Sequence, residues 1–119
     1  MAESLKSNIL DDIKSLLGIQ LSDTSFDPAL IIFINSALAS LVQMGVCSSS
    51  NLETGFSITD TSAVWSDFID SDNRLSMIKS YVYLKVKLDF DPPVNQSLIE
   101  SYRNSLKEYE YRLYIQKGS

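Results

Sequence analysis

LSMIKSYVYLKVKLDF, residues 75–90, is the stretch that decides the expected fold, because it has the pattern of a helix with two apolar faces. At about 100° per residue, its apolar side chains fall into two stripes on roughly opposite sides of the helix. One stripe can pack on the protein's own core. The other then needs a partner, either another helix of the same chain or another subunit. The first stripe holds Leu75, Ile78, Val82 and Val86, and the second holds Met77, Tyr81, Leu84 and Leu88.

Apolar residues recur at helical spacing on both sides of this stretch, and caps and breakers mark where further helices begin and end. Asp27 and Pro28 together are typical of a helix start. Asp91-Pro92-Pro93 stops the two-faced helix, because proline lacks the backbone N–H. The remaining signals are the candidate N-caps Ser4, Asp70, Ser71 and Asp72 and the helix-ending glycines Gly18 and Gly45.

These signals predict an all-α fold, a small bundle of about four helices, with residues 1–119 forming a single domain. The helices are expected near residues 4–17, 28–44, 72–90 and 94–115. The first stripe of the two-faced helix should share a core with a stripe of the second helix. That second-helix stripe is Leu30, Ile34, Ala37, Leu38, Leu41 and Val42, and the last helix offers Val94, Leu98, Tyr102, Leu106, Tyr109 and Leu113.

A long loop is expected between the second and third helices, and its sequence also allows an extended arm. Residues 46–61 are rich in serine, and the alternation in Gly55-Phe-Ser-Ile-Thr59 allows a short strand. Contact with a neighbouring subunit and a plain flexible connector are equally good interpretations of this stretch. Residues 62–69 follow as a short helix or turn. Their Trp65 is interpreted as a packing anchor, with an interface hot spot as the alternative.

Charge is distributed unevenly along the chain. Residues 1–60 carry seven acidic and two basic residues, a net charge of −5, whereas residues 61–119 are balanced. The sequence pI near 4.5 and the lack of a basic cluster argue against ordinary phosphate-backbone binding. The acidic half is interpreted as a solvated surface, or alternatively as a surface that must not retain nucleic acid. No run of about 18 apolar residues suggests a membrane span, and no leader peptide is expected.

Catalytic, metal and cofactor chemistry is not expected. The chain has no histidine, which is the commonest general base and metal ligand. The single Cys47 excludes an internal disulfide, and its serine-rich surroundings indicate an incidental thiol. Asp67, Asp70 and Asp72 lack the glycine and the terminal glutamate of a calcium loop, so helix capping is the better interpretation. The sequence therefore predicts a protein that binds, without catalytic residues, metal or cofactor.

Apolar residues that lack an evident partner in the chain are predicted to form interfaces. Tyr111, Tyr114 and Ile115 leave the core stripe of the last helix near its end. Aromatic residues in such positions are typical of interfaces. The complete set of predicted interface residues is Trp65, Met77, Tyr81, Leu84, Leu88, Tyr111, Tyr114 and Ile115.

Over residues 9–115 the chain resembles the head–tail connector (adaptor) proteins of long-tailed bacteriophages. The resemblance rests on ILDDIKSLLGI, TSFDPALIIFINSALASLVQMGV, GFSITDTSAVWSDFI, IKSYVYLKVKLDFDPP and the closing EYEYRL, in this order. It implies a homo-oligomeric ring, usually of twelve copies, located in the virion neck after synthesis in the bacterial host cytoplasm. The ring would bind the portal and the stopper or tail-completion proteins and extend a channel through which DNA passes without specific binding.

Two other functions fit the same residues. One is another neck protein, such as a stopper or a tail-completion protein, which would usually be richer in strands. The other is a cytosolic helical regulator or inhibitor that acts as a dimer, with the second apolar stripe of residues 75–90 as its seam. No membrane partner is expected for any of them.

Overall fold

A computed structural model of the protein describes residues 5–70 and 73–116, and within these ranges all regular elements are helical. The expectation of an all-α bundle is confirmed. The α-helices are α1 (Ile9–Leu17), α2 (Asp27–Gln43), α3 (Ser49–Thr54), α4 (Leu75–Phe90) and α5 (Gln96–Gln116), and Trp65–Asp67 form a 3₁₀ turn, η1.

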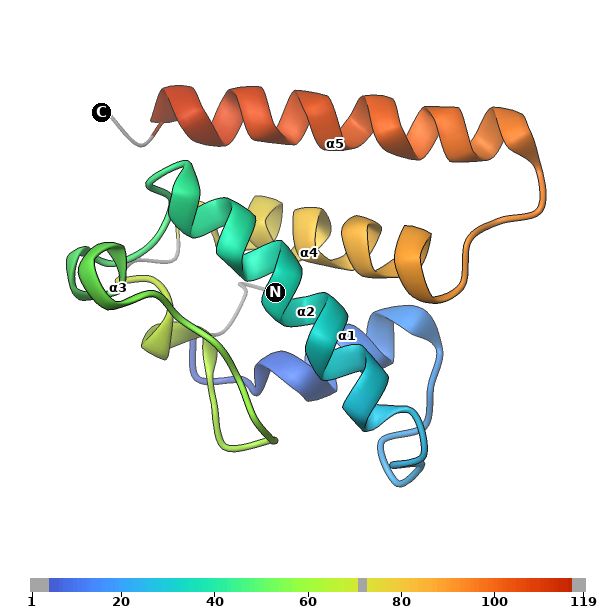
Figure 1. Cartoon of the computed structure of the whole chain (residues 1–119), viewed down its shortest axis with the longest axis horizontal. Coiled ribbons are helices and arrows are strands. Elements are labelled where there is room, and N and C mark those ends of the chain that lie inside the picture. The colour runs from blue at the N-terminus through green and yellow to red at the C-terminus, as the bar shows by residue number, and fades with distance from the viewer. Residues whose placement is uncertain (1–4, 71–72, 117–119) are drawn as a thin grey trace.

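Helix α4 is the centre of the bundle and contacts α1, α2 and α5 (Figure 1). Helix α2 crosses it, α5 runs along one side of it, and α1 lies on the side away from α5. The first stripe of α4 is fully buried with the stripe of α2, as predicted. The core formed in this way comprises Leu30, Ile34, Ala37, Leu38 and Leu41 of α2 with Leu75, Ile78, Val82 and Val86 of α4, closed by Ile9, Leu10 and Ile13 of α1.

The second stripe of α4 contacts α5 through Tyr81, so it has a partner helix in the same chain. Tyr81 is fully buried, and its hydroxyl donates a hydrogen bond of 2.9 Å to the Glu110 carboxylate of α5. Leu84 is 9% exposed, and Leu113 of α5 is fully buried in the same core. Of the two partners that the sequence left open, the fold therefore uses its own last helix.

The first two helices begin differently from expectation. Ser4 lies outside the described residues, and α1 instead starts after Asn8, whose side-chain oxygen accepts the Asp11 N–H at 3.0 Å. The N-cap position of α2 is Phe26, and the expected cap Asp27 is the first helical residue. The Asp27 carboxylate is 2.9 Å from the Lys14 ammonium, so it ties α2 to α1 instead of capping.

The other helix ends follow the sequence signals more closely. Gly18 ends α1 in the left-handed conformation at φ 81°, as predicted. Helix α4 begins at Leu75 after Arg74, and the candidate caps Ser71 and Asp72 lie outside the described residues. Helix α5 begins only at Gln96, where the Asn95 side chain accepts the Leu98 N–H at 3.2 Å.

The segment that leads into α5 and the first turn of α5 do not reach the core, which corrects the predicted stripe of this helix. Val94 is 104% exposed and Leu98 is 43% exposed. Figure 1 shows that this end of α5 extends past the end of α4, so no partner helix lies beneath it. The core contact of α5 is made by its later turns, where Leu106 and Tyr109 pack against the core and Leu113 enters it.

Residues 46–61 are more ordered than the predicted loop. Six of them form α3, and no strand occurs here in the described ranges. The Asn51 amide donates to the carbonyls of Asp67 and Phe68 at 2.9 and 3.0 Å. Farther on, the Asn35 side chain of α2 both accepts from and donates to the backbone of Ile58, at 2.7 and 3.0 Å. Two amide side chains therefore fix this stretch to the bundle, and its exposed tip is residues 59–61.

Candidate assembly surfaces

Trp65 is a packing anchor in the single chain. It is fully buried, and its indole N–H donates to Oδ2 of Asp12 at 2.8 Å. The same carboxylate oxygen accepts from the Ser7 hydroxyl at 2.6 Å and lies 3.0 Å from the Lys79 ammonium. Lys79 also sits 5.6 Å from the centre of the Trp65 ring, within the range of a cation–π contact. The network joins the N-terminal segment, α1, η1 and α4.

Asp12 is held in its charged form by these partners. Burial alone would raise the pKa of Asp12, but hydrogen bonds from Ser7, Lys79 and Trp65 outweigh burial, and the pKa lies below its usual value of 3.8. The network is therefore intact at neutral pH and weakens in acid.

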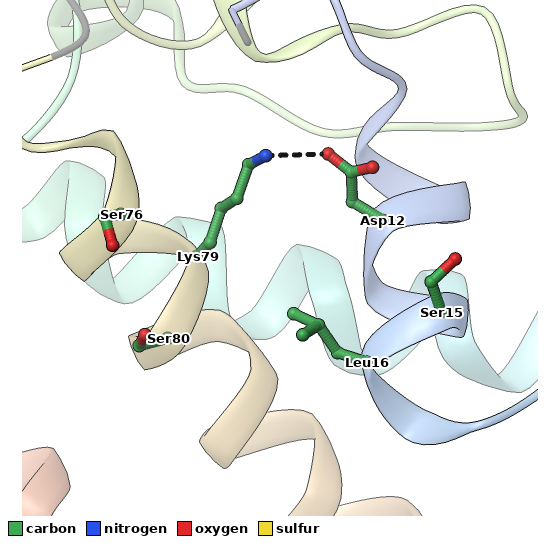
Figure 2. A pocket seen from close by; sticks show the side chains of 6 residues that line it. All are labelled: Asp12, Ser15, Leu16, Ser76, Lys79 and Ser80. Carbon is green, nitrogen blue, oxygen red and sulfur yellow. Dashed lines mark ion pairs between the residues drawn. The ribbon is translucent and has the colours of Figure 1, made fainter. Parts of the chain in front are cut away.

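A small groove between α1 and α4 lies beside this network (Figure 2). Leu16 points from α1 toward α4, and the Asp12–Lys79 ion pair bridges the two helices at one end. Ser76 and Ser80 of α4 add hydroxyl groups, and the Asp12 carboxylate that lines the groove with them is engaged with Lys79. The volume is about 250 Å³. With its one carboxylate already paired, the groove has the features of a seam between helices and lacks an activated nucleophile.

The predicted interface residues divide into two groups by burial. Tyr81 and Leu84 are buried with Trp65, and Met77 and Leu88 are partly buried. A neighbouring subunit could contact only the edges of this group. The other group is exposed on the last turns of α5, where Tyr111, Tyr114 and Ile115 are 67%, 59% and 51% exposed. That these residues contact a neighbour stays a prediction.

The exposed group faces away from the bundle. Tyr111 and Ile115 each lie two residues from the buried Leu113, which places them about 200° around the helix from it. They are four residues apart and therefore share the outer face of α5. Arg112 lies between them in sequence, is 56% exposed, and pairs with Glu108 one turn earlier. We call Tyr111, Arg112, Tyr114 and Ile115 the C-terminal patch.

A pocket that the sequence did not indicate lies between the start of α2 and the tip of the 46–61 stretch. Its apolar floor is Leu10, Pro28 and Ile31, and its volume is about 470 Å³. Asp27 and Asp60 contribute carboxylates, and three threonine side chains complete the lining. We call it the acidic pocket. Its residues come from three separate segments, so only the fold brings them together. The lining residues are Leu10, Thr24, Asp27, Pro28, Ile31, Thr59, Asp60 and Thr61.

The two acidic residues of this pocket differ in their surroundings. Asp27 is paired with the buried Lys14, whose ammonium also donates to the Leu21 carbonyl at 3.1 Å. Asp60 is exposed and accepts hydrogen bonds from the backbone and hydroxyl of Ser62 at 2.8 and 2.6 Å, and these hydrogen bonds hold the pKa of Asp60 below its usual value. Asp60 is therefore a negative charge displayed at the mouth of the pocket.

Residues 5–70 and 73–116 contain no candidate metal site and no candidate membrane-spanning helix. No group of three or more histidine, cysteine, aspartate or glutamate side chains there could hold a metal ion. In the same part of the chain, no helix combines the length and the apolar character needed to cross a membrane. Cys47 is a free thiol, and burial raises its pKa.

Comparison with known proteins identifies the family. Residues 9–119 match the model of a family described as phage connector protein. The chain belongs to the phage connector family. The match covers every helix described above, and it supports a structural role in the phage neck. Searches of curated proteins and of solved structures gave no significant match.

Proposed function

We propose that this connector protein is the adaptor of the virion neck, a homo-oligomeric ring of twelve copies that joins the portal of the head to the stopper or tail-completion protein. The proposal is supported by the family membership and by one structural observation. That observation is the outward-facing C-terminal patch, in which Tyr111, Tyr114 and Ile115 are all more than half exposed. Aromatic and apolar side chains grouped on an outer helix face are typical of protein interfaces.

The proposed activity is binding alone. The groove beside Asp12 has hydroxyls whose neighbouring carboxylate is already paired with Lys79, and the acidic pocket has carboxylates of which one is already paired with Lys14. Such sites can hold another protein's side chains but offer no nucleophile for a reaction. The mechanism is therefore the positioning of two larger assemblies against each other.

The acidic character of residues 1–60 suits a ring through which DNA moves. Like charge between the channel wall and the phosphates prevents the backbone from being retained. Asp11, Asp23 and Asp60 belong to this half of the chain, and Asp23 and Asp60 are exposed, so these carboxylates can contribute to such a field. Which of them line the channel depends on how the subunits are oriented in the ring.

The structure bears on the alternative of a dimeric regulator. That alternative used the second stripe of α4 as its seam, and this stripe is covered by α5, with Tyr81 fully buried. A dimer would have to displace α5 or use a different surface. The adaptor proposal needs neither change, because its contacts lie on the outer face of α5.

Electron microscopy of the virion tests the proposal directly. An adaptor should be found as a ring between portal and tail, with the C-terminal patch in contact with another protein chain. A virion in which the protein is absent from the neck, or lies on the capsid surface or at the tail tip, would contradict the proposal. A purified chain that stays a dimer with its portal present would favour the regulator.

A further inference from the structure

We infer that the C-terminal patch of one subunit docks into the acidic pocket of the next, so that copies of this chain join head to tail. The occupant of the pocket is thus a second copy, and the inference rests on the proposed ring. Two different surfaces of the same chain would meet in every contact, which is the heterologous type of interface that generates rings when the rotation closes.

The first argument is that Tyr111 and Ile115 of the patch are left exposed by residues 5–70 and 73–116. Tyr111 and Ile115 point away from the bundle, since they lie about 200° around α5 from the buried Leu113. Helix α5 packs on α4 through its opposite side. In the part of the chain that the structure describes, nothing buries the side chains of Tyr111 and Ile115, so a neighbouring molecule can cover them.

The second argument is the match of shape and polarity. The acidic pocket has an apolar floor of Leu10, Pro28 and Ile31 and a volume of about 470 Å³. A space of this size admits the ring of Tyr111 together with the side chain of Ile115. The threonine hydroxyls that line the pocket can pair with a phenol hydroxyl, which a wholly apolar site would leave without a hydrogen bond.

The third argument is complementary charge. Asp60 displays its carboxylate at the mouth of the pocket, and Arg112 is the cation of the patch. Arg112 is engaged with Glu108, but both side chains are more than half exposed, and a surface pair of this kind holds its partners weakly. The guanidinium can therefore turn to Asp60 of a neighbour with little loss.

The fourth argument is the placement of the two surfaces on the molecule. In Figure 1 the C-terminal end of α5 lies at one side of the bundle, and the start of α2 lies at the opposite side. Head-to-tail rings of many subunits need this arrangement. Their two contact surfaces depart from exact opposition by a full turn divided by the subunit number, or about 30° for twelve copies. Surfaces on adjacent sides would instead close a much smaller ring.

Disulfide trapping in solution provides the test. In a Cys47→Ser background, Thr59→Cys places a thiol in the pocket and Ile115→Cys places one in the patch, both at exposed positions. The two single-cysteine proteins are mixed at high concentration under mild oxidation. We expect the mixed disulfide dimer to form roughly tenfold faster than either homodimer. A protein with both cysteines should give a ladder of longer oligomers.

The matched control replaces Ile115→Cys by Ser97→Cys, an exposed thiol at the other end of α5. With Thr59→Cys it should give no preference for the mixed dimer. Equal trapping with Ser97→Cys, faster formation of the Ile115→Cys homodimer, or the absence of any mixed dimer would each overturn the inference. These results do not bear on whether the protein lies in the neck of the virion. The adaptor proposal is therefore tested separately, by electron microscopy of the virion.

A charge exchange checks the pairing of Asp60 with Arg112. Asp60→Lys and Arg112→Glu should each slow the mixed trapping roughly tenfold, because each places like charges together. Combining Asp60→Lys in the pocket partner with Arg112→Glu in the patch partner should restore most of the rate. Loss without restoration, in variants whose far-UV circular dichroism is unchanged, would contradict this contact.

Discussion

Truncation of Ile78 to alanine should remove a large part of the stability of the subunit. Ile78 is fully buried where α4 packs on α2. The substitution deletes three buried carbon atoms at about 0.8 kcal/mol each, or about 2.4 kcal/mol. The cavity left behind raises the expected cost to about 2–5 kcal/mol. A domain of 119 residues has a total stability of about 6–18 kcal/mol, so the loss is substantial.

Urea denaturation followed by far-UV circular dichroism measures this free energy of unfolding. The matched control is Ile32→Ala, the same substitution on α2 at a side chain that is 67% exposed. It should be neutral within about 0.5 kcal/mol, and alanine's better helix propensity can make it slightly stabilising. Equal shifts for the two variants, or an unchanged midpoint for Ile78→Ala, would show that the α2–α4 contact is not the core.

Three further outcomes follow from particular contacts. Tyr81→Phe should cost about 1 kcal/mol by removing the hydrogen bond to Glu110, whereas the same change at Tyr83 should be nearly neutral, as urea denaturation would show. Folding lowers the pKa of Asp12, so the contribution of this carboxylate to stability is present above its unfolded pKa of 3.8 and is lost as the pH falls through the lower folded pKa. Asp12→Asn should therefore flatten this part of the acid-unfolding curve. An unaltered slope would refute the network. Hydrogen exchange should find the Ile58 N–H protected in the free subunit by Asn35, while the last turn of α5 gains protection only on assembly.

The main helices could be predicted because their apolar periodicity is strong and is reinforced locally. Asp27-Pro28 marks the start of α2 and Gly18 marks the end of α1, to within one residue. Buried stripes at helical spacing then fix which sides of α2 and α4 face each other. These signals are all encoded within a few residues of where they act, so tertiary context does not change them.

The departures from prediction occur where a distant group decides the structure. Asn51 is buried because carbonyls of residues 67 and 68 lie above it, and a serine-rich stretch carries no local sign of that contact. Asp27 serves Lys14 instead of the helix N-terminus for the same reason. Val94 fits a helical stripe in sequence, yet it precedes α5 and is fully exposed. The acidic pocket needs three segments to meet, so no single stretch predicts it.

The place of α5 determines which surfaces remain for assembly. An excess of apolar residues on α4 suggested an interface, but α5 covers that excess with Leu113 and the Tyr81–Glu110 contact. The surfaces left for partners are consequently on the outer side of α5 and in the pocket beside α2. Deleting α5 would expose the buried stripe and remove the patch together, so truncation cannot separate stability from assembly. Substitutions at Tyr111 and Ile115 can, because these side chains contribute little to the folded subunit and face the position that a neighbouring copy would occupy.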